Sequence, residues 1–178
     1  RSVQILSRDW DGQRIILDEA VVTIANPSPG AAKNAALAWR VMRECFPHIA
    51  VETLKKGFEQ ARNPGRMETV QISPRVVLSG DHNLDGIRDL ESLLKEMQTR
   101  PLHLVVGFSL DKPYQEMLAQ LLPYADKIWL TSIPAARGKL PPEYLAMGAV
   151  IEDAKTAVQM ALAETPPDGM LLVTGSLY

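Results

Sequence analysis

The stretch of residues 75–97 constrains the fold more than any other part of the sequence. A short apolar run at residues 76–78 leads into the small polar sequence Ser-Gly-Asp-His-Asn, after which apolar residues recur at helical spacing. This order predicts a buried strand, a tight turn and a helix that Asn83 caps. In open α/β folds such a turn lies at the carboxyl edge of the sheet, where ligands bind. We therefore expect Asp81 and His82 at a ligand-binding edge, the alternative being a turn that is only a polar connector.

Strands and helices alternate through the rest of the chain. Apolar runs typical of buried strands lie at residues 102–106, 128–131 and 170–174, and helical patterns lie at residues 113–122, 142–147 and 154–164. This alternation predicts an α/β fold with a mostly parallel sheet, helices on both faces and right-handed crossovers.

Parallel strands bring the residues that follow them to one edge of the sheet. The polar or small residues at these positions are Ser79, Asp81, His82, Asn83, Ser109, Asp111, Lys112, Thr174, Gly175 and Ser176. A lysine, a histidine and a serine beside helix N-termini suit an anionic ligand such as a carboxylate or a phosphate. Taken singly, Lys112 more often lies in a solvated loop and Ser176 more often caps a backbone group, so the prediction depends on their convergence.

The first third of the chain has a different pattern. Residues 3–24 alternate between apolar and polar positions and contain an Asp-Gly turn signal, which predicts two or three antiparallel strands. The Pro- and Gly-containing residues 26–30 then stop regular structure. Two helices follow, one from Lys33 that packs through Leu37, Ala38, Val41 and Met42, and one over residues 50–62 that packs through Val51, Leu54, Phe58 and Ala61. The sequence Asn63-Pro64-Gly65 breaks the second helix, so we expect domains at residues 1–63 and 64–178.

The composition excludes several classes of protein. A formal net charge of −2 gives no basic surface for nucleic acid. No apolar run reaches the roughly 18 residues that a membrane-spanning helix needs, so we expect no membrane partner. Cys45 is the single cysteine and cannot form an internal disulfide, which favours a reducing compartment and a cytoplasmic location.

Motifs of several familiar sites are missing from the sequence. It contains no G-x-x-x-x-G-K-[ST] loop, no G-x-G-x-x-G after a strand and no G-x-S-x-G elbow. His82 and Asp81 are neighbours whose side chains diverge on an extended turn, with no third ligand spaced for a metal, so we expect no metal site. By itself the chain lacks the parts to bind and activate a nucleotide.

Several stretches taken together resemble one family, the folylpolyglutamate synthase and dihydrofolate synthase branch of the Mur ligases. Asn-Pro-Gly-Arg-Met-Glu at residues 63–68 resembles the family's PGRxE link, and residues 78–88 resemble its LDGAHNPxGxR motif. Residues 105–113 resemble VxGxxxDKD, residues 171–178 resemble LVTGSLY, and residues from Asn34 are similar to the family's NAALA helix. The motifs occur in the family's order from about Asn34 to the end of the chain.

The resemblance implies a Rossmann-like glutamate-ligase domain that follows the last part of an ATP-binding domain. The family phosphorylates a carboxylate with ATP and lets the amine of glutamate displace the phosphate. Carried over by motif, Arg66 matches the arginine that reaches the ATP phosphates, and His82 matches a histidine near the nucleotide and the incoming glutamate. Lys112 and Ser176 match the residues that hold the glutamate carboxylates.

The chain departs from the family in its turn. Ser79 stands where the family has aspartate, Asp81 where it has alanine and Leu84 where it has proline. An aspartate two positions along keeps the same side of an extended segment. We therefore expect Asp81 and His82 to form the catalytic pair.

The resemblance also implies that parts of the enzyme lie outside this sequence. The family's phosphate loop and Mg²⁺-binding residues lie upstream, so residues 1–63 would be the last part of an ATP-binding domain and the chain alone would be inactive. A start at Arg1 agrees with an excised fragment. The expected ligands are ATP, glutamate and a pteroate or folate, with Mg²⁺ bound mainly by the missing domain. The alternatives are another Mur-type ligase of peptidoglycan synthesis and a non-catalytic α/β binding module.

Overall fold

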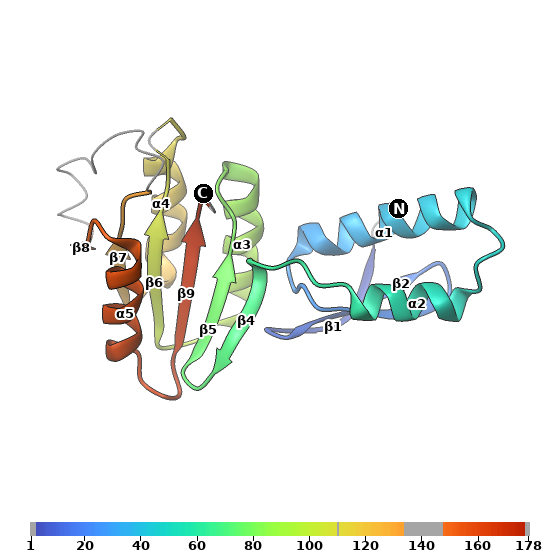
Figure 1. Cartoon of the computed structure of the whole chain (residues 1–178), viewed down its shortest axis with the longest axis horizontal. Coiled ribbons are helices and arrows are strands. Elements are labelled where there is room, and N and C mark those ends of the chain that lie inside the picture. The colour runs from blue at the N-terminus through green and yellow to red at the C-terminus, as the bar shows by residue number, and fades with distance from the viewer. Residues whose placement is uncertain (1–2, 110, 134–147, 177–178) are drawn as a thin grey trace. The chain divides into compact units, whose positions relative to one another are not determined.

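The computed structural model describes residues 3–109, 111–133 and 148–176, which form two compact units, Arg1–Pro64 and Gly65–Tyr178 (Figure 1). The first unit holds a three-stranded antiparallel sheet of β1 (Gln4–Asp9), β2 (Gly12–Leu17) and β3 (Ala20–Ile24), followed by helices α1 (Pro29–Cys45) and α2 (Val51–Gln60). Its core joins the inward face of the sheet to both helices through Ile15, Leu17, Val22, Ile24, Ala32, Ala35, Trp39 and Leu54. The predicted antiparallel strands are therefore present.

Helix α1 differs from its prediction in where it begins and in the face that it buries. It begins at Pro29 because Ser28 caps it, its hydroxyl accepting from the amide of Ala31 at 3.2 Å, and because proline suits the first turn. The predicted packed residues Leu37 and Val41 are instead exposed, at 65% and 48%.

Trp39 fixes the orientation of this helix. Its indole nitrogen donates to the carboxylate of Asp18 at 2.9 Å, and its ring meets that of Phe58 edge to face with centroids 5.6 Å apart. A buried tryptophan with a satisfied N–H outweighs two smaller apolar residues on the opposite side. The face of Ala32, Ala35 and Trp39 therefore points to the core.

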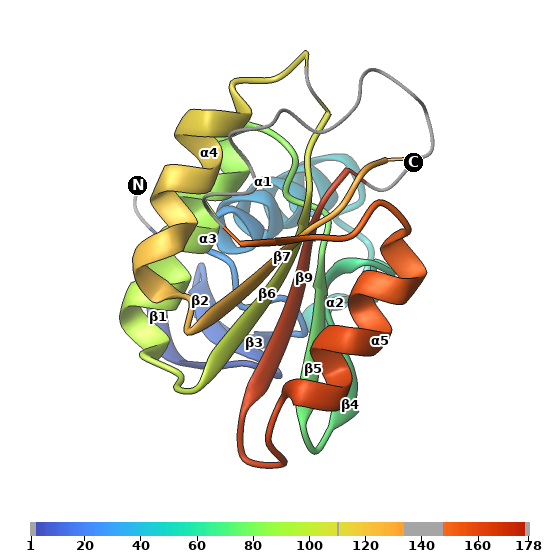
Figure 2. The ribbon, with the colours of Figure 1, turned by 90° about the vertical axis from the view of Figure 1, so that its left-hand side faces the viewer.

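The second unit is built on a six-stranded sheet in the order β4-β5-β9-β6-β7-β8. The strands are β4 (Arg66–Ile72), β5 (Arg75–Ser79), β6 (Leu102–Gly107), β7 (Lys127–Leu130), β8 (Ala149–Val150) and β9 (Met170–Gly175). Only β4 is antiparallel to its neighbour, and the other described pairs are parallel. Helices α3 (Leu84–Met97) and α4 (Tyr114–Leu121), with the short η1 (Leu122–Tyr124), cover one face, and α5 (Ala154–Glu164) covers the other (Figure 2).

Strand β6 lies inside the sheet and explains the unbroken apolar run of the sequence. All six of its residues are buried, as expected for a parallel strand with helices on both faces. The predicted strands at residues 76–78, 102–106, 128–131 and 170–174 correspond to β5, β6, β7 and β9. The predicted α/β fold with a mostly parallel sheet, preceded by a small α+β part, is confirmed. The helix predicted at residues 142–147 falls outside the described residues.

Strand β4 was not predicted. Among the described strands it pairs with β5 alone, at the edge of the sheet, and it carries Val70 and Ile72 exposed, at 52% and 67%. Because it mixes charged, polar and apolar residues, its sequence lacks the pattern of a buried strand. Among the described residues no helix has the length and hydropathy of a membrane span.

Candidate functional site

Three turns of the second unit begin at the same edge of the sheet. Ser79 at the end of β5 pairs with Thr174 of β9, which in turn pairs with Val106 of β6. Neighbouring strands lie about 4.8 Å apart. The segments after β5, β9 and β6, which carry His82, Ser176 and Lys112, therefore start within a few strand spacings of one another.

The ends of β9 and β6 approach each other unusually closely. Gly175 adopts a φ of +128°, and a Cβ atom there would lie 2.0 Å from the carbonyl oxygen of Gly107. Only glycine fits this position without moving the neighbouring backbone. The amide of Ser176 then donates to the same Gly107 oxygen at 2.9 Å. This contact holds Ser176 against the end of β6.

The turn after β5 is held by side chains on its own residues. The carboxamide oxygen of Asn83 accepts from the amide of Gly86 at 2.8 Å, which confirms the predicted helix cap. The ring Nδ1 of His82 lies 2.8 Å from the carbonyl oxygen of Gly80. Since a carbonyl oxygen only accepts, Nδ1 carries a proton in this contact, and in the neutral imidazole Nε2 is then the acceptor.

Arg66 joins this turn from the neighbouring strand. Its guanidinium Nη1 donates to the carbonyl oxygen of Gly80 at 2.7 Å, so the same oxygen accepts from both Arg66 and His82. A β-bulge separates the pairings of Arg66 and Glu68, and the intervening Met67 has a φ of +55°. Bulges re-aim side chains at the edges of sheets. Here the bulge sets Arg66 directly opposite Ser79.

Asp81 completes the cluster. The hydroxyl of Ser79 donates to its carboxylate, and the hydroxyl of Thr174 donates to its backbone oxygen at 3.4 Å. Burial raises the pKa of the Asp81 carboxyl above its ordinary value, and the negative charge of Asp89 adds to that rise. The hydrogen bond from Ser79 and the charge of Arg66 oppose it without cancelling it.

Lys112 lies in an exposed turn after β6. The amide of Lys112 donates to the carbonyl oxygen of Ser109 at 3.1 Å, and the hydroxyl of Ser109 donates to the carboxylate of Asp111. The side chain of Lys112 is exposed, in the segment that follows β6. This turn thus adds a cation to the sheet edge.

The five predicted site residues divide into two groups. Arg66, Asp81 and His82 gather at one turn through hydrogen bonds and charge, whereas Lys112 and Ser176 lie in the segments that follow the adjacent strands β6 and β9. Sequence reasoning missed two backbone acceptors: the oxygen of Gly80, which accepts from Arg66 and His82, and the oxygen of Asp81, which accepts from the hydroxyl of Thr174. A carbonyl acceptor leaves no signal in a sequence. Among the described residues no group of three or more His, Cys, Asp or Glu side chains could hold a metal ion.

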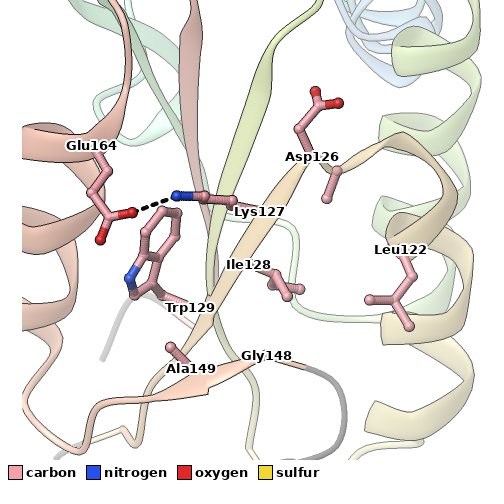
Figure 3. Close-up of a pocket in the computed structure, with 9 residues that line it drawn as sticks. Leu122, Asp126, Lys127, Ile128, Trp129, Gly148, Ala149 and Glu164 are labelled. Carbon is pink, nitrogen blue, oxygen red and sulfur yellow. Dashed lines mark hydrogen bonds and ion pairs between the residues drawn. The ribbon is translucent and has the colours of Figure 1, made fainter.

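A pocket of about 470 Å³ lies elsewhere, beside the first half of β7 (Figure 3). Its lining comes from η1, β7, β8 and α5, and none of the five predicted site residues belongs to it. Lys127 reaches Glu164 at 2.7 Å, and Asp126 accepts from the amide of Leu102 at 2.7 Å. Because these charges are already paired with protein groups, the pocket is a weaker candidate for an anion site than the sheet edge.

Comparison with known proteins connects the chain and its fold to one family. The family model described as "Mur ligase, glutamate ligase domain" matches residues 65–177, which confirms the resemblance predicted from the motifs. The chain is 33% identical over 187 residues to the probable bifunctional folylpolyglutamate synthase/dihydropteroate synthase of Haloferax volcanii, covering 94% of this chain and 22% of that protein. It is 32% identical over 157 residues to the dihydrofolate synthase/folylpolyglutamate synthase of Bacillus subtilis, covering 82% of this chain and 36% of that protein.

The fold has matching solved structures. The folylpolyglutamate synthase of Mycobacterium tuberculosis, solved in complex with ADP, matches with a TM-score of 0.79 and 25% identity. The match covers 98% of this chain and 45% of that protein. The chain therefore spans less than half the length of the two curated relatives and of this structure.

Proposed function

The chain belongs to the Mur ligase, glutamate ligase domain family, and on that premise we propose that it is part of an ATP-dependent ligase that joins glutamate to dihydropteroate or folate. The observation that carries the proposal is the carboxyl edge of the sheet. Arg66 and His82 share the oxygen of Gly80 there, while Lys112 and Ser176 follow the adjacent strands. Curated relatives with such ligase names support the choice of substrates.

The formation of an amide through an acyl phosphate needs positive charge and hydrogen-bond donors around the reacting groups. ATP transfers its γ-phosphoryl group to the acceptor carboxylate, giving an acyl phosphate and ADP. The amine of glutamate attacks the acyl carbon, loses a proton, and the C–O bond to phosphate breaks. Negative charge builds on the phosphoryl oxygens and on the tetrahedral intermediate, so preorganised donors lower the barrier.

Each site residue of this chain has a separate role in the reaction. The guanidinium of Arg66 binds phosphate oxygens, for which its planar fork of donors is suited. In its neutral form His82 presents Nε2 as an acceptor at the same turn, and its role is to accept the proton of the incoming amine. The ammonium of Lys112 and the hydroxyl of Ser176 hold the carboxylates of glutamate. Asp81 belongs to this site through its contact with Ser79.

The remaining parts of the reaction belong outside this chain. We assign the phosphate loop and Mg²⁺ to an upstream ATP-binding domain, of which residues 1–63 are the last part, because the sequence has no P-loop motif and the described residues include no metal cluster. The isolated chain is then folded but inactive. The exposed free thiol of Cys45 agrees with a cytoplasmic location.

The test is turnover by the full-length protein that contains this chain. We expect ADP release that requires both glutamate and dihydropteroate or folate. ADP release that requires an amino acid and a muramyl substrate, used in place of the pteroate or folate, would assign the protein to peptidoglycan synthesis. No ADP release with either would favour a non-catalytic α/β binding module, an alternative that the replacement of the family aspartate by Ser79 keeps open.

A further inference from the structure

The carboxylate of Asp81 lies against the side chain of Ser79. The hydroxyl of Ser79 donates a hydrogen bond to the carboxylate of Asp81, so the chain folds back over the end of β5. Ser79 itself is only 2% exposed. The carboxylate therefore occupies the space directly beside a buried position of the strand.

Position 79 is also the cross-strand neighbour of Arg66. The two residues are Cα partners in the antiparallel ladder of β4 and β5. Directly opposite residues in such a ladder point to the same face, with Cβ atoms about 4.5–5.5 Å apart. A carboxylate carried by residue 79 would consequently lie within reach of the Arg66 guanidinium.

The titratable groups that act on the carboxyl of Asp81 come from three parts of the fold. Arg66 from β4 and His82 from the turn lower the pKa of its carboxyl, and Asp89 from α3 raises it. The geometry agrees with this direction, because the carboxylate of Asp81 contacts Ser79, which is the cross-strand partner of Arg66.

The first turn of α3 leaves room for this carboxylate. A Cβ atom at Gly86 would lie 2.7 Å from Oδ1 of Asp81 and 3.2 Å from its Cβ. Any larger residue at position 86 would push the side chain of Asp81 out of its place. The backbone of the helix and the hydroxyl of Ser79 together fix where the carboxylate points.

We propose that Asp81 is a positioning residue whose carboxylate holds Arg66 at the sheet edge, and that positions 79 and 81 are interchangeable hosts for this one carboxylate. The proposal rests on the proposed function for the role of Arg66 toward ATP. The exchange between the two positions is independent of that function, since it concerns only contacts within the chain.

The proposal predicts that two harmful substitutions correct each other. Asp81→Ala removes the carboxylate and leaves Arg66 and the buried hydroxyl of Ser79 without it. Ser79→Asp alone places two carboxylates in contact, one of which must take up a proton. In Ser79→Asp/Asp81→Ala a single carboxylate returns beside Arg66, and the removed side chain provides the space that it needs.

The experiment measures steady-state kinetics and urea unfolding midpoints of the full-length protein with these three variants. Each single variant is expected to raise the KM for ATP at least about fivefold and to lower the unfolding midpoint. The KM for glutamate should stay within about twofold. The double variant should return both properties to within about twofold of the unmodified protein. The control is Asp85→Ala in the first turn of α3. The side chain of Asp85 is 94% exposed, and its removal should change neither KM.

Three results would overturn the proposal. In the first, the double variant is no better than the worse single variant. In the second, Asp81→Ala changes neither the KM for ATP nor the midpoint. In the third, the midpoint recovers in the double variant while the KM for ATP never moved, which makes the carboxylate structural only. If Asp81→Ala does not fold, the nearly isosteric Asp81→Asn replaces it as the single variant, with the same expectations. If the unmodified protein shows no glutamate-dependent turnover, the proposed function fails and the role toward ATP fails with it, whereas recovery of the midpoint in the double variant still decides the exchange.

Discussion

Replacing Gly175 by alanine should open the sheet exactly where the candidate site lies. The new Cβ would stand 2.0 Å from the oxygen of Gly107, against the 3.0 Å below which real Cβ contacts essentially never fall. The ends of β9 and β6 must therefore separate by about 1 Å or twist apart. A positive φ in a non-glycine residue costs about 1–3 kcal/mol, and forced overpacking costs a similar amount, about 1–3 kcal/mol. We expect a total loss of about 2–6 kcal/mol.

Residue-resolved amide hydrogen exchange measures this loss within the unit that contains it. In Gly175→Ala the slowest amides of β6 and β9 should lose protection at least about 30-fold, which corresponds to about 2 kcal/mol. Amides of β2 in the first unit serve as the internal control and should be unchanged. A change in β9 protection of less than about threefold would refute the reasoning, since the overlap would then have been relieved at almost no cost.

Two further predictions concern stability. His103 is buried on β6, where burial above all, and then Lys127, lowers the pKa of its imidazole below 6.5, while Asp126 and Glu164 oppose this. The unfolded chain then binds more protons than the folded one as the pH falls below about 6.5, so stability should fall with decreasing pH in this window; His103→Gln should weaken that dependence in urea titrations at several pH values, and an unchanged slope would contradict it. Gly57 lies inside α2, and a new Cβ there would meet no atom of another part of the chain within 4 Å. Gly57→Ala should therefore raise the unfolding free energy by about 0.5–1 kcal/mol. A lower midpoint in thermal unfolding would argue against the open environment.

Much of the second unit could be predicted because local patterns and tertiary packing agree there. The apolar run of β6 is buried on both faces, and Asn83 caps α3 as its position before the helix indicates. The parallel direction of β6 and its neighbouring strands could be predicted as well, because strands that alternate with helices pair in parallel.

The parts that could not be predicted depend on competition between elements. Leu37 and Val41 match a helical stripe as well as Trp39 does, and the tertiary contacts of Trp39 with Asp18 and Phe58 decide which side faces the core. Strand β4 has no clear pattern because one of its edges has no described partner strand.

The candidate site was predictable to the level of its edge but not of its contacts. Strand order places His82, Lys112 and Ser176 at one edge, whereas Arg66 reaches the same edge only through β4 and its bulge. The shared oxygen of Gly80 and the return of Asp81 to Ser79 are matters of backbone direction. They become visible only in three dimensions.

The most direct test of the central claim is the KM for glutamate of the full-length protein carrying Lys112→Ala or Ser176→Ala. If the edge holds the carboxylates of glutamate, each substitution should raise this KM by one to two orders of magnitude, or about 1.4–2.8 kcal/mol, with the KM for ATP little changed. Lys95→Ala removes an exposed lysine from the last turn of α3 and should leave the KM for glutamate unchanged. An unaltered KM for glutamate in both site variants would contradict the claim.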